Sequence, residues 1–361
     1  MYCVQPSLLK DDPDTIIAAL LAAQPQVDTL PPRYRPLIGI LVAPCTLDNG
    51  RPYLVGADIA CIEAVVASGG EARLIPVRPP FPDEHAFELL LDAILQCDGL
   101  LFSGSASQLE PRLDSQADHL QIASPFSLLE WWRMLMTLIA RETLTPLLGI
   151  GTGAASINAA LGGTLRQERA GYPCCETSPD QREVRRILEL DPDKLALCAR
   201  GCNCSWPNVE LPAENQWIEP SCMHDHSLDT VAPGLIAWSW ADGQVQGFGY
   251  PGPSAWCVLA TLFHLEAQPL DNLGRSLFGG YLQACRAYAA SLREVLRTTR
   301  MRDKFLRKLY ADPLAQPFLS GPLISQAASM ESENGNEGNE KNCCLQHLAN
   351  HFQHVRWGST A

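Results

Sequence analysis

The segment Pro146–Leu165, PLLGIGTGAASINAALGGTL, places a short apolar run directly before a tight corner made of small residues. The run PLLGI is typical of a buried central strand, and the residues that follow it indicate a helix. A strand that turns sharply into a helix is the geometry of a nucleophile elbow, which lifts one side chain clear of the backbone at the top of a sheet. The segment lacks the Lys-Ser/Thr ending of a P-loop and the glycine spacing of a dinucleotide-binding motif. It therefore predicts an elbow with Gly151 at its tip.

Strands and helices alternate along the chain before this elbow. Apolar runs predict strands at Leu37–Pro44, Ala72–Val77 and Cys97–Ser105, and helical spacing predicts helices at Tyr53–Gly70, Phe87–Gln96 and Ser127–Pro146. This order favours an α/β fold, with a mostly parallel central sheet flanked by helices on both faces. Ligands of such sheets bind beyond the carboxyl ends of the strands. We therefore expect the SGS loop after the third strand and the GTG corner to face one crevice.

The chain after the elbow carries weaker patterns. Residues 167–221 are rich in Cys, Pro, Trp and Asn, which predicts a loop-rich segment over the crevice with one strand at Glu183–Leu190. A hairpin is expected around Asp242-Gly243, followed by a buried strand within Ala255–Glu266 and a long helix over Leu273–Tyr310.

These patterns indicate one domain with an arm and a tail. Residues 1–35 form the arm, with a short helix at Thr15–Gln24 before the breaker-rich PPRYRP, and residues 36–300 form the domain. Residues 301–326 are predicted to be a helical extension. Residues 327–361 are polar, acidic and rich in Gly and Asn, so we expect a disordered tail with at most a short helix at Cys343–Val355.

Charge and hydropathy exclude several classes of partner. The formal net charge is −13 with a pI near 5.1, and the basic residues are scattered, so nucleic acid is not an expected partner. No apolar run approaches the ~20 residues that span a bilayer, and the amino terminus lacks the basic start of a signal peptide. We expect a cytoplasmic protein with no membrane association.

Fourteen cysteines raise the alternatives of disulfides or a metal site. A long chain without an export signal favours reduced thiols. One region is dense in thiolate and imidazole groups, namely Cys198, Cys202, Cys204, Cys222, His224 and His226. Its CxC and HxH spacings lack the CxxC pairs of structural zinc sites. We therefore expect no metal, and no cofactor is indicated.

Seven ordered blocks between about Pro36 and Arg297 resemble the class I glutamine amidotransferase-like superfamily, most closely its gamma-glutamyl-gamma-aminobutyrate hydrolase branch. These blocks are RPLIGILV, YLVGADIACIEAVVASGGEARLIPV, CDGLLFSGSASQLEPRL, PLLGIGTGAASINAALGGTL, SCMHDHS, FHLE and LGRSLFGGYLQACR. Each block alone is a weak signal, but their order and spacing are specific. The resemblance implies the flavodoxin-like α/β fold of that superfamily.

The resemblance also implies roles for individual residues. The family elbow reads Gly-Ile-Cys-Arg-Gly with cysteine as the nucleophile, and the matching residues here are Gly149-Ile150-Gly151-Thr152-Gly153, so Gly151 stands at the nucleophile position. The family's His-Pro-Glu matches FHLE, which implies His264 as the base and Glu266 as the residue that orients it, with Leu265 in place of proline. Without the resemblance, His264 would be read as a hydrogen-bonded histidine that ends a strand.

Other matches concern substrate binding. Gly104 and Ser105 match the loop that presents backbone N–H groups to an oxyanion, and the alternative is an ordinary Gly-Ser turn. His224 matches the substrate-loop histidine. Three positions depart from the family pattern: Ser221 stands for asparagine, His226 for glutamine, and Ala155 for the glutamine that commonly follows the elbow. These departures weaken the expectation that a glutamyl group is recognised, and a surface loop without a ligand is the alternative.

A cysteine hydrolase needs an atom that attacks and then leaves, and glycine has none. The sequence therefore predicts a pseudoenzyme that binds a small gamma-glutamyl or glutamine-like ligand, or a partner enzyme. The alternative is an active hydrolase or transferase that uses Thr152, Cys222 or a water activated by His264. A role in a larger assembly without any ligand is a third reading. The sequence does not indicate an oligomeric state.

Overall fold

The computed structural model describes residues 30, 34–46, 52–56, 59–76, 91–104, 126–167, 186–201, 216–218, 226–251, 256–267, 272–291, 307–308, 311–313 and 315. Several predictions lie outside these residues, namely the helix of the amino-terminal arm, the disordered acidic tail, and the site candidates Ser105, Cys222 and His224.

A ten-stranded sheet forms the centre of the molecule, with the strand order β2-β1-β4-β5-β12-β11-β10-β7-β8 and with β3 also paired to β1. Its strands are β1 Leu37–Thr46, β2 Pro52–Gly56, β3 Glu71–Pro76, β4 Gly99–Phe102, β5 Leu147–Ile150, β7 Arg186–Leu190, β8 Gln216–Ile218, β10 Ile236–Ala241, β11 Gln244–Gly249 and β12 Val258–Thr261. The pairs β3–β1, β1–β4, β4–β5 and β5–β12 are parallel. The strand β5 that leads into the elbow is therefore a central strand of the parallel part, as predicted.

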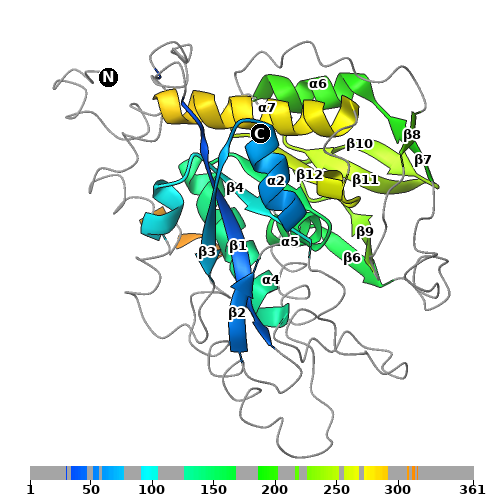
Figure 1. The fold of residues 1–361 in the computed structure, drawn as a ribbon. Helices are drawn as coiled ribbons and strands as arrows, with labels where there is room; N and C mark the ends of the chain where they lie inside the picture. The colour runs from blue at the N-terminus through cyan, green and yellow to red at the C-terminus, as the bar shows by residue number, and fades with distance from the viewer. Residues whose placement is uncertain are drawn as a thin grey trace, which may run out of the picture.

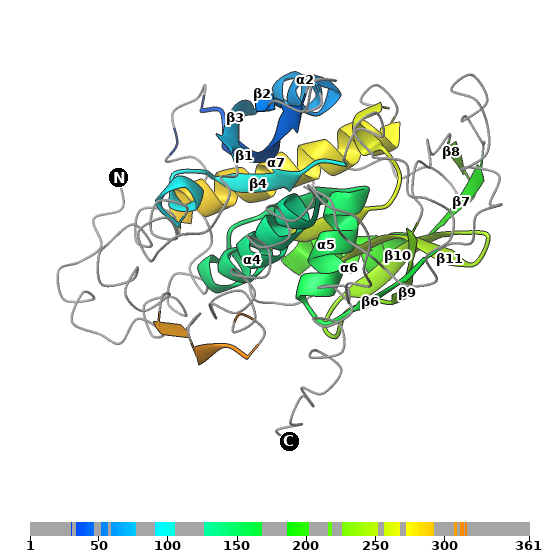
Figure 2. The ribbon, with the colours of Figure 1, turned by 90° about the horizontal axis from the view of Figure 1, so that it is seen from below.

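Helices cover both faces of this sheet (Figures 1 and 2). They are α2 Ile59–Ala67, α4 Phe126–Thr143, α5 Thr152–Ala160, α6 Pro192–Gly201 and α7 Asn272–Ser291. Figure 2 shows α2 on one side of the sheet and α4 and α5 on the other, and residues of α7 share a core with those of α2. The expected α/β fold, with a central sheet between helical layers, is thus confirmed.

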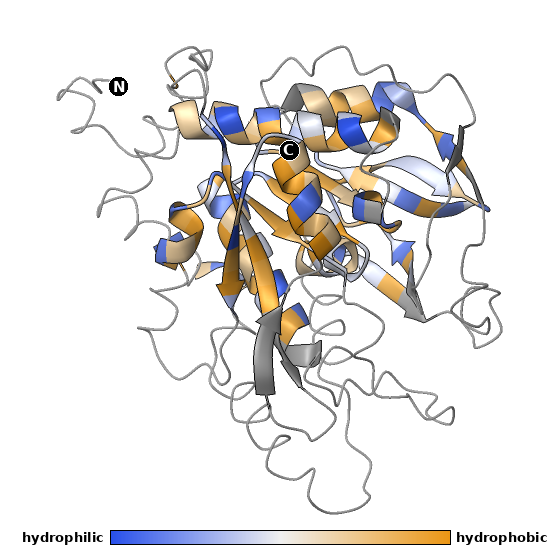
Figure 3. Cartoon of the chain, viewed as in Figure 1, coloured by the Kyte–Doolittle hydropathy of each residue, from blue (hydrophilic) through white to orange (hydrophobic). Residues whose placement is uncertain are grey.

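The two helical layers enclose two hydrophobic cores. Leu100, Phe102 and Leu147 pack with residues of α4 and α5, whereas Leu101 and Leu148 pack with residues of α2 and α7. This alternation follows from the pleat, which points successive side chains to opposite faces. Figure 3 shows the central strands as mainly hydrophobic and the helices as a mixture of hydrophobic and hydrophilic residues. Continuous apolar runs in the sequence were needed because each central strand is covered twice.

Two sequence predictions need correction. The YLVG part of the expected helix Tyr53–Gly70 belongs to strand β2, which pairs antiparallel with the extended end of β1, and the helix itself begins only at Ile59. Within residues 167–221, the described parts are not loops over the crevice. Strands β7 and β8 extend the main sheet beyond β10, and α6 packs into the same core as α7. Strand β7 lies within the strand predicted at Glu183–Leu190, whereas the high Cys, Pro and Trp content concealed β8 and α6 because it masked their periodicity.

The predicted hairpin is confirmed between β10 and β11. Asp242 and Gly243 both have positive φ, at 50° and 74°, which is the two-residue turn that matches the twist of the flanking strands. A separate small sheet pairs β6, Thr164–Gln167, with β9, His226–Thr230.

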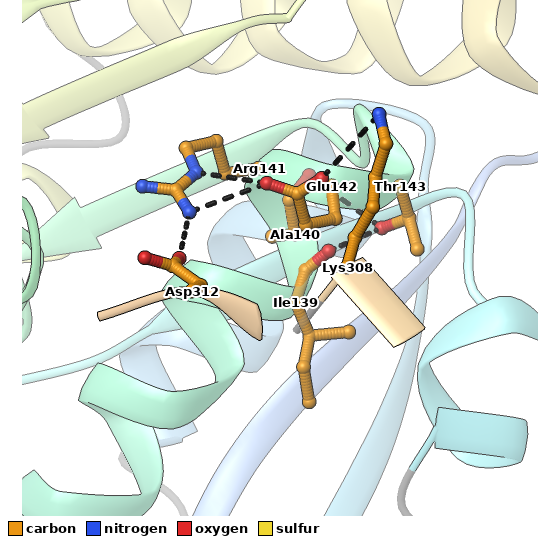
Figure 4. A network of polar contacts seen from close by, with 7 residues as sticks. All are labelled: Ile139, Ala140, Arg141, Glu142, Thr143, Lys308 and Asp312. Carbon is orange, nitrogen blue, oxygen red and sulfur yellow. Dashed lines mark hydrogen bonds and ion pairs between the residues drawn. The ribbon is translucent and has the colours of Figure 1, made fainter. Parts of the chain in front are cut away.

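A segment beyond α7 packs back against the end of α4 (Figure 4). The Arg141 guanidinium donates to a carboxylate oxygen of Asp312 and also pairs with Glu142. Lys308 lies 4.0 Å from Glu142, and Ala315 is fully buried in the core that contains α4. The long helix predicted for Leu273–Tyr310 is described as α7 only to Ser291. Among the described residues, no helix combines the length and the apolarity that crossing a membrane requires.

Candidate active site at the carboxyl ends of the parallel strands

The corner between β5 and α5 has the sharp geometry that the sequence predicted. Gly151 adopts φ 59° and ψ −122°, a region that residues with a side chain rarely enter. Its N–H donates to the carbonyl of Thr261 on β12, and its carbonyl accepts from the N–H of Ala155 as α5 begins. One residue thus ends the strand ladder and starts the helix. Since Gly151 has no side chain, it contributes none to cap the helix.

Two further glycines allow the helix to approach the sheet. A Cβ atom at Gly149 would lie 3.0 Å from the backbone of Ala154, and a Cβ at Gly153 would overlap the carbonyl group of Phe102 on β4. Glycine at both positions is therefore required by close approach of backbone to backbone. The three alternating glycines, 149, 151 and 153, explain why this corner is built from small residues.

His264 and Glu266 lie just beyond the end of β12, beside the elbow strand. Nδ1 of His264 is 2.6 Å from Oε1 of Glu266, and both side chains are buried. With Glu266 ionised, Nδ1–H of His264 donates to it, which fixes the ring tautomer and leaves Nε2 as the proton acceptor. Glu266 lies within a short 3-10 helix, Leu265–Ala267, which begins at the residue that stands in place of the family's proline. The pair has the arrangement of a general base and the carboxylate that orients it.

Gly104 lies against the His264 ring. A Cβ atom at Gly104 would be 3.1 Å from Cε1 of His264 and 3.9 Å from the carbonyl oxygen of Ile150. The loop after β4 therefore meets both the imidazole and the last residue of β5. We call Gly104, Gly151, Thr152, His264 and Glu266 the carboxyl-end site.

A buried arginine that the sequence did not single out joins the site to α4. Nη1 of Arg133 donates to Oγ1 of Thr152 at 3.0 Å, and Nη2 donates to the carbonyl oxygen of Ser103 at 2.6 Å. Arg133 is 1% exposed. The hydroxyl of Thr152 therefore contacts α4, as expected for a side chain that points away from an elbow tip. The only sequence signal was one charged residue inside the apolar run WWRMLMTLIA.

Burial shapes the electrostatics beside the elbow. Burial lowers the pKa of Arg133 to about 10, and electrostatic interactions with Glu130 and, secondarily, Cys61 oppose this change. Glu130 is partly exposed as a residue, but its carboxyl group is enclosed by protein, so burial raises its pKa and the nearby Arg133 partly offsets the rise. Arg133 therefore keeps its positive charge at neutral pH.

Asn158 on α5 connects the elbow helix to the small sheet. Its Oδ1 accepts from the N–H of Ala232 at 2.8 Å, and its Nδ2 donates to the carbonyl of Thr230 at 2.9 Å. In that sheet, Gln167 pairs with His226, the first residue of β9. The candidates of the preceding loop, Ser221, Cys222 and His224, lie outside the described residues, and only the backbone of His226 is described.

The expectation of no metal concerns a cluster that is mostly outside the described residues. Cys198 is described, and its reduced thiol is buried on α6. Within the part of the chain that the structure describes, no group of three or more His, Cys, Asp or Glu side chains could hold a metal ion.

Comparison with known families identifies the fold. The model of the family Peptidase C26 matches residues 36–266, which include the elbow, His264 and Glu266. This chain belongs to the peptidase C26 family. The superfamily assignment made from the seven sequence blocks is therefore confirmed.

Individual relatives of this C26 protein are distant. A Mycobacterium tuberculosis protein named "Putative glutamine amidotransferase Rv2859c" is 27% identical over 228 residues, which are 63% of this chain and 67% of the relative. Among solved structures, a "putative gmp synthase subunit a protein" from Thermoplasma acidophilum covers 73% of this chain and 100% of its own, with 18% identity and a TM-score of 0.41.

Proposed function

We propose that this C26 protein has lost its catalytic cysteine and uses the carboxyl-end site to bind a ligand instead of hydrolysing it. The observation that carries the proposal is the backbone of Gly151. Its φ of 59° and ψ of −122° belong to a strained elbow, which chains keep where a side chain must be presented, yet here the position presents none. Removing the nucleophile of a triad lowers the rate by a factor of order 10⁶ in the subtilisin case.

The ligand that fits best is a small gamma-glutamyl or glutamine-like compound, in keeping with the gamma-glutamyl-gamma-aminobutyrate hydrolase branch that the sequence resembles. Three features support an acyl or carboxylate group at the site. The amino terminus of α5 carries partial positive charge, the backbone of Gly104 lies beside His264, and Arg133 supplies a full positive charge near Thr152. The proposal also includes a partner enzyme that presents such a group to the site.

The alternative is an active hydrolase or transferase of gamma-glutamyl amides. The intact pair of His264 and Glu266 favours it, because a base held in one tautomer can activate a water. Thr152 is a poor substitute nucleophile, since its oxygen accepts a hydrogen bond from Arg133 on α4. Cys222 remains a candidate nucleophile only from the sequence.

Ligand binding without turnover is the result that separates these functions. Purified protein is mixed with glutamate, glutamine or a gamma-glutamyl amine, and the melting temperature and the ligand concentration are followed together. We expect a dose-dependent rise in melting temperature, equivalent to about 2.7 kcal/mol at a hundredfold excess over Kd, with no ligand consumed.

Two variants serve as controls. His264→Ala should weaken the ligand-induced shift, whereas Lys308→Ala should leave it unchanged, because Lys308 lies beyond α7 and pairs with Glu142 at the end of α4. Consumption of the ligand that stops in His264→Ala would instead establish the active enzyme. No shift with any of these compounds would refute the ligand proposal and favour a role in an assembly.

A further inference from the structure

We infer that Arg133 is a positioning residue of the carboxyl-end site, which locks the end of β4 to the start of α5 and sets the electrostatic potential at the elbow tip. The inference deepens the proposed function, because it says what prepares the site for an anionic group such as a carboxylate.

The contacts of Arg133 reach two different segments of the site. Ser103 directly follows β4, and Thr152 directly follows the elbow tip, and the two strands concerned, β4 and β5, are parallel neighbours. One planar guanidinium therefore holds both segments at once with two donors in a rigid fork. A lysine ammonium could supply the charge but not this fixed spacing.

The burial of Arg133 indicates that its charge has a role beyond packing. Arg133 lies among apolar residues of α4, and Nε of its guanidinium has no hydrogen-bond partner among the described residues. The enclosure lowers its pKa to about 10, because burial disfavours the charged form. An apolar side chain would fill such a space without this penalty. The two donated bonds go to a carbonyl and a hydroxyl, so they do not neutralise the cation.

A positive charge fixed one residue from the elbow tip favours any anion held there. Its ionisable neighbours are Glu130 on the same helix and Cys61 on α2, and His264 with Glu266 lies across the site beside Gly104. In the protein as it exists, the anion would be a group of the ligand. In a Gly151→Cys variant, it would be the introduced thiolate, which makes that thiol a reporter of the local potential.

The test titrates the introduced thiol by its ultraviolet thiolate absorbance, as the difference between Gly151→Cys protein and the same protein without that substitution. Adding Arg133→Met should raise the pKa of the introduced thiol by about 1 unit, which is a tenfold loss of thiolate at a pH well below that pKa. Thr137→Val is the matched control. Thr137 is buried on the same helix and donates to the carbonyl of Arg133, so its loss weakens α4 without removing a charge.

If Arg133→Met does not fold, two milder variants test the same inference. Arg133→Lys and Thr152→Val both break the fork while sparing the charge, and each should raise the thiol pKa by a smaller amount, about 0.3 to 0.5 units. A thiol pKa that is the same in all these variants as in Thr137→Val would overturn the inference. The titration needs neither ligand nor turnover, so its failure is distinguishable from a failure of the proposed function.

Discussion

The backbone of Gly104 lies so close to the His264 ring that a Cβ atom at residue 104 would stand 3.1 Å from Cε1. Contacts of this length are tighter than side chains normally make, so the ring must move if residue 104 gains a methyl group. We expect Gly104→Ala to lower the free energy of unfolding by about 1 to 2 kcal/mol in urea denaturation.

The matched control for Gly104→Ala is Gly279→Ala. Gly279 lies within α7, where an added Cβ would meet no atom of the described residues within 4 Å. Alanine in a helix interior is favoured over glycine by about 1 kcal/mol, so this variant should be more stable than the wild type. Equal stability of the two variants would show that the Gly104 backbone does not press on His264.

Asn158 should be one of the most sensitive polar residues of the chain. It is fully buried and joins α5 to the backbone of Thr230 and Ala232. Asn158→Ala would leave the buried N–H of Ala232 and the partly buried carbonyl of Thr230 without their side-chain partner, so we expect a loss of about 2 to 4 kcal/mol in denaturant unfolding. Thr164→Val, which removes exposed hydrogen bonds to Asp229 and Thr230, should cost less than about 1 kcal/mol. If both variants lost a similar amount of unfolding free energy, Asn158 would not be the main polar link between α5 and the backbone of Thr230 and Ala232.

Cys198 should make the protein less stable at alkaline pH. Burial raises the pKa of its thiol to about 12, and the neighbouring Cys257 adds to the rise. An unfolded thiol loses its proton at roughly pH 8.5, so the unfolded chain binds fewer protons above that pH. Stability contributed by the neutral thiol is complete below pH 8.5 and is lost as the pH rises towards 12.

Cys198→Ala provides the comparison for this pH dependence. We expect the slope of unfolding free energy against pH between 9 and 11 to be shallower in the variant by about 1.4 kcal/mol per pH unit. If Cys198→Ala and the wild type have the same slope, folding does not raise the pKa of the Cys198 thiol. Mass spectrometry after brief alkylation at pH 8 gives a second measurement, in which the native Cys198 peptide should stay unmodified.

The contact between α4 and the segment beyond α7 rests on Asp312 rather than on Lys308. The Arg141–Asp312 pair is partly buried, with side-chain exposures of 23% and 13%, whereas Lys308 is 45% exposed and 4.0 Å from Glu142. Asp312→Ala should therefore lower the free energy of unfolding by about 1 to 2 kcal/mol, and Lys308→Ala by less than about 0.5 kcal/mol. If Lys308→Ala lowered the thermal stability more than Asp312→Ala, the contact would depend on the pair Lys308–Glu142 instead.

The sequence was most informative where one physical requirement dominated. The strands β4 and β5 are apolar on both faces, and the Asp242-Gly243 turn needs positive φ twice, so each left an unambiguous pattern. The pairing of Pro52–Gly56 with the end of β1 was missed because short strands beside a helix start carry no distinctive period. Arg133 was missed because its partners, Ser103 and Thr152, are remote in sequence and one of them is a backbone carbonyl. Such contacts depend on which strands and helices lie side by side, so the residue types alone do not predict them.

The central claim is that the elbow has kept its base and lost only its nucleophile. The most direct measurement is hydrolysis of a gamma-glutamyl anilide by the wild type, by Gly151→Cys, and by Gly151→Cys combined with His264→Ala. Denaturant unfolding first checks that each variant folds, because a side chain at residue 151 adds backbone strain of about 1 to 3 kcal/mol. We predict no turnover by the wild type, turnover by Gly151→Cys, and its loss when His264 is also removed. Wild-type turnover that disappears in His264→Ala would contradict the account.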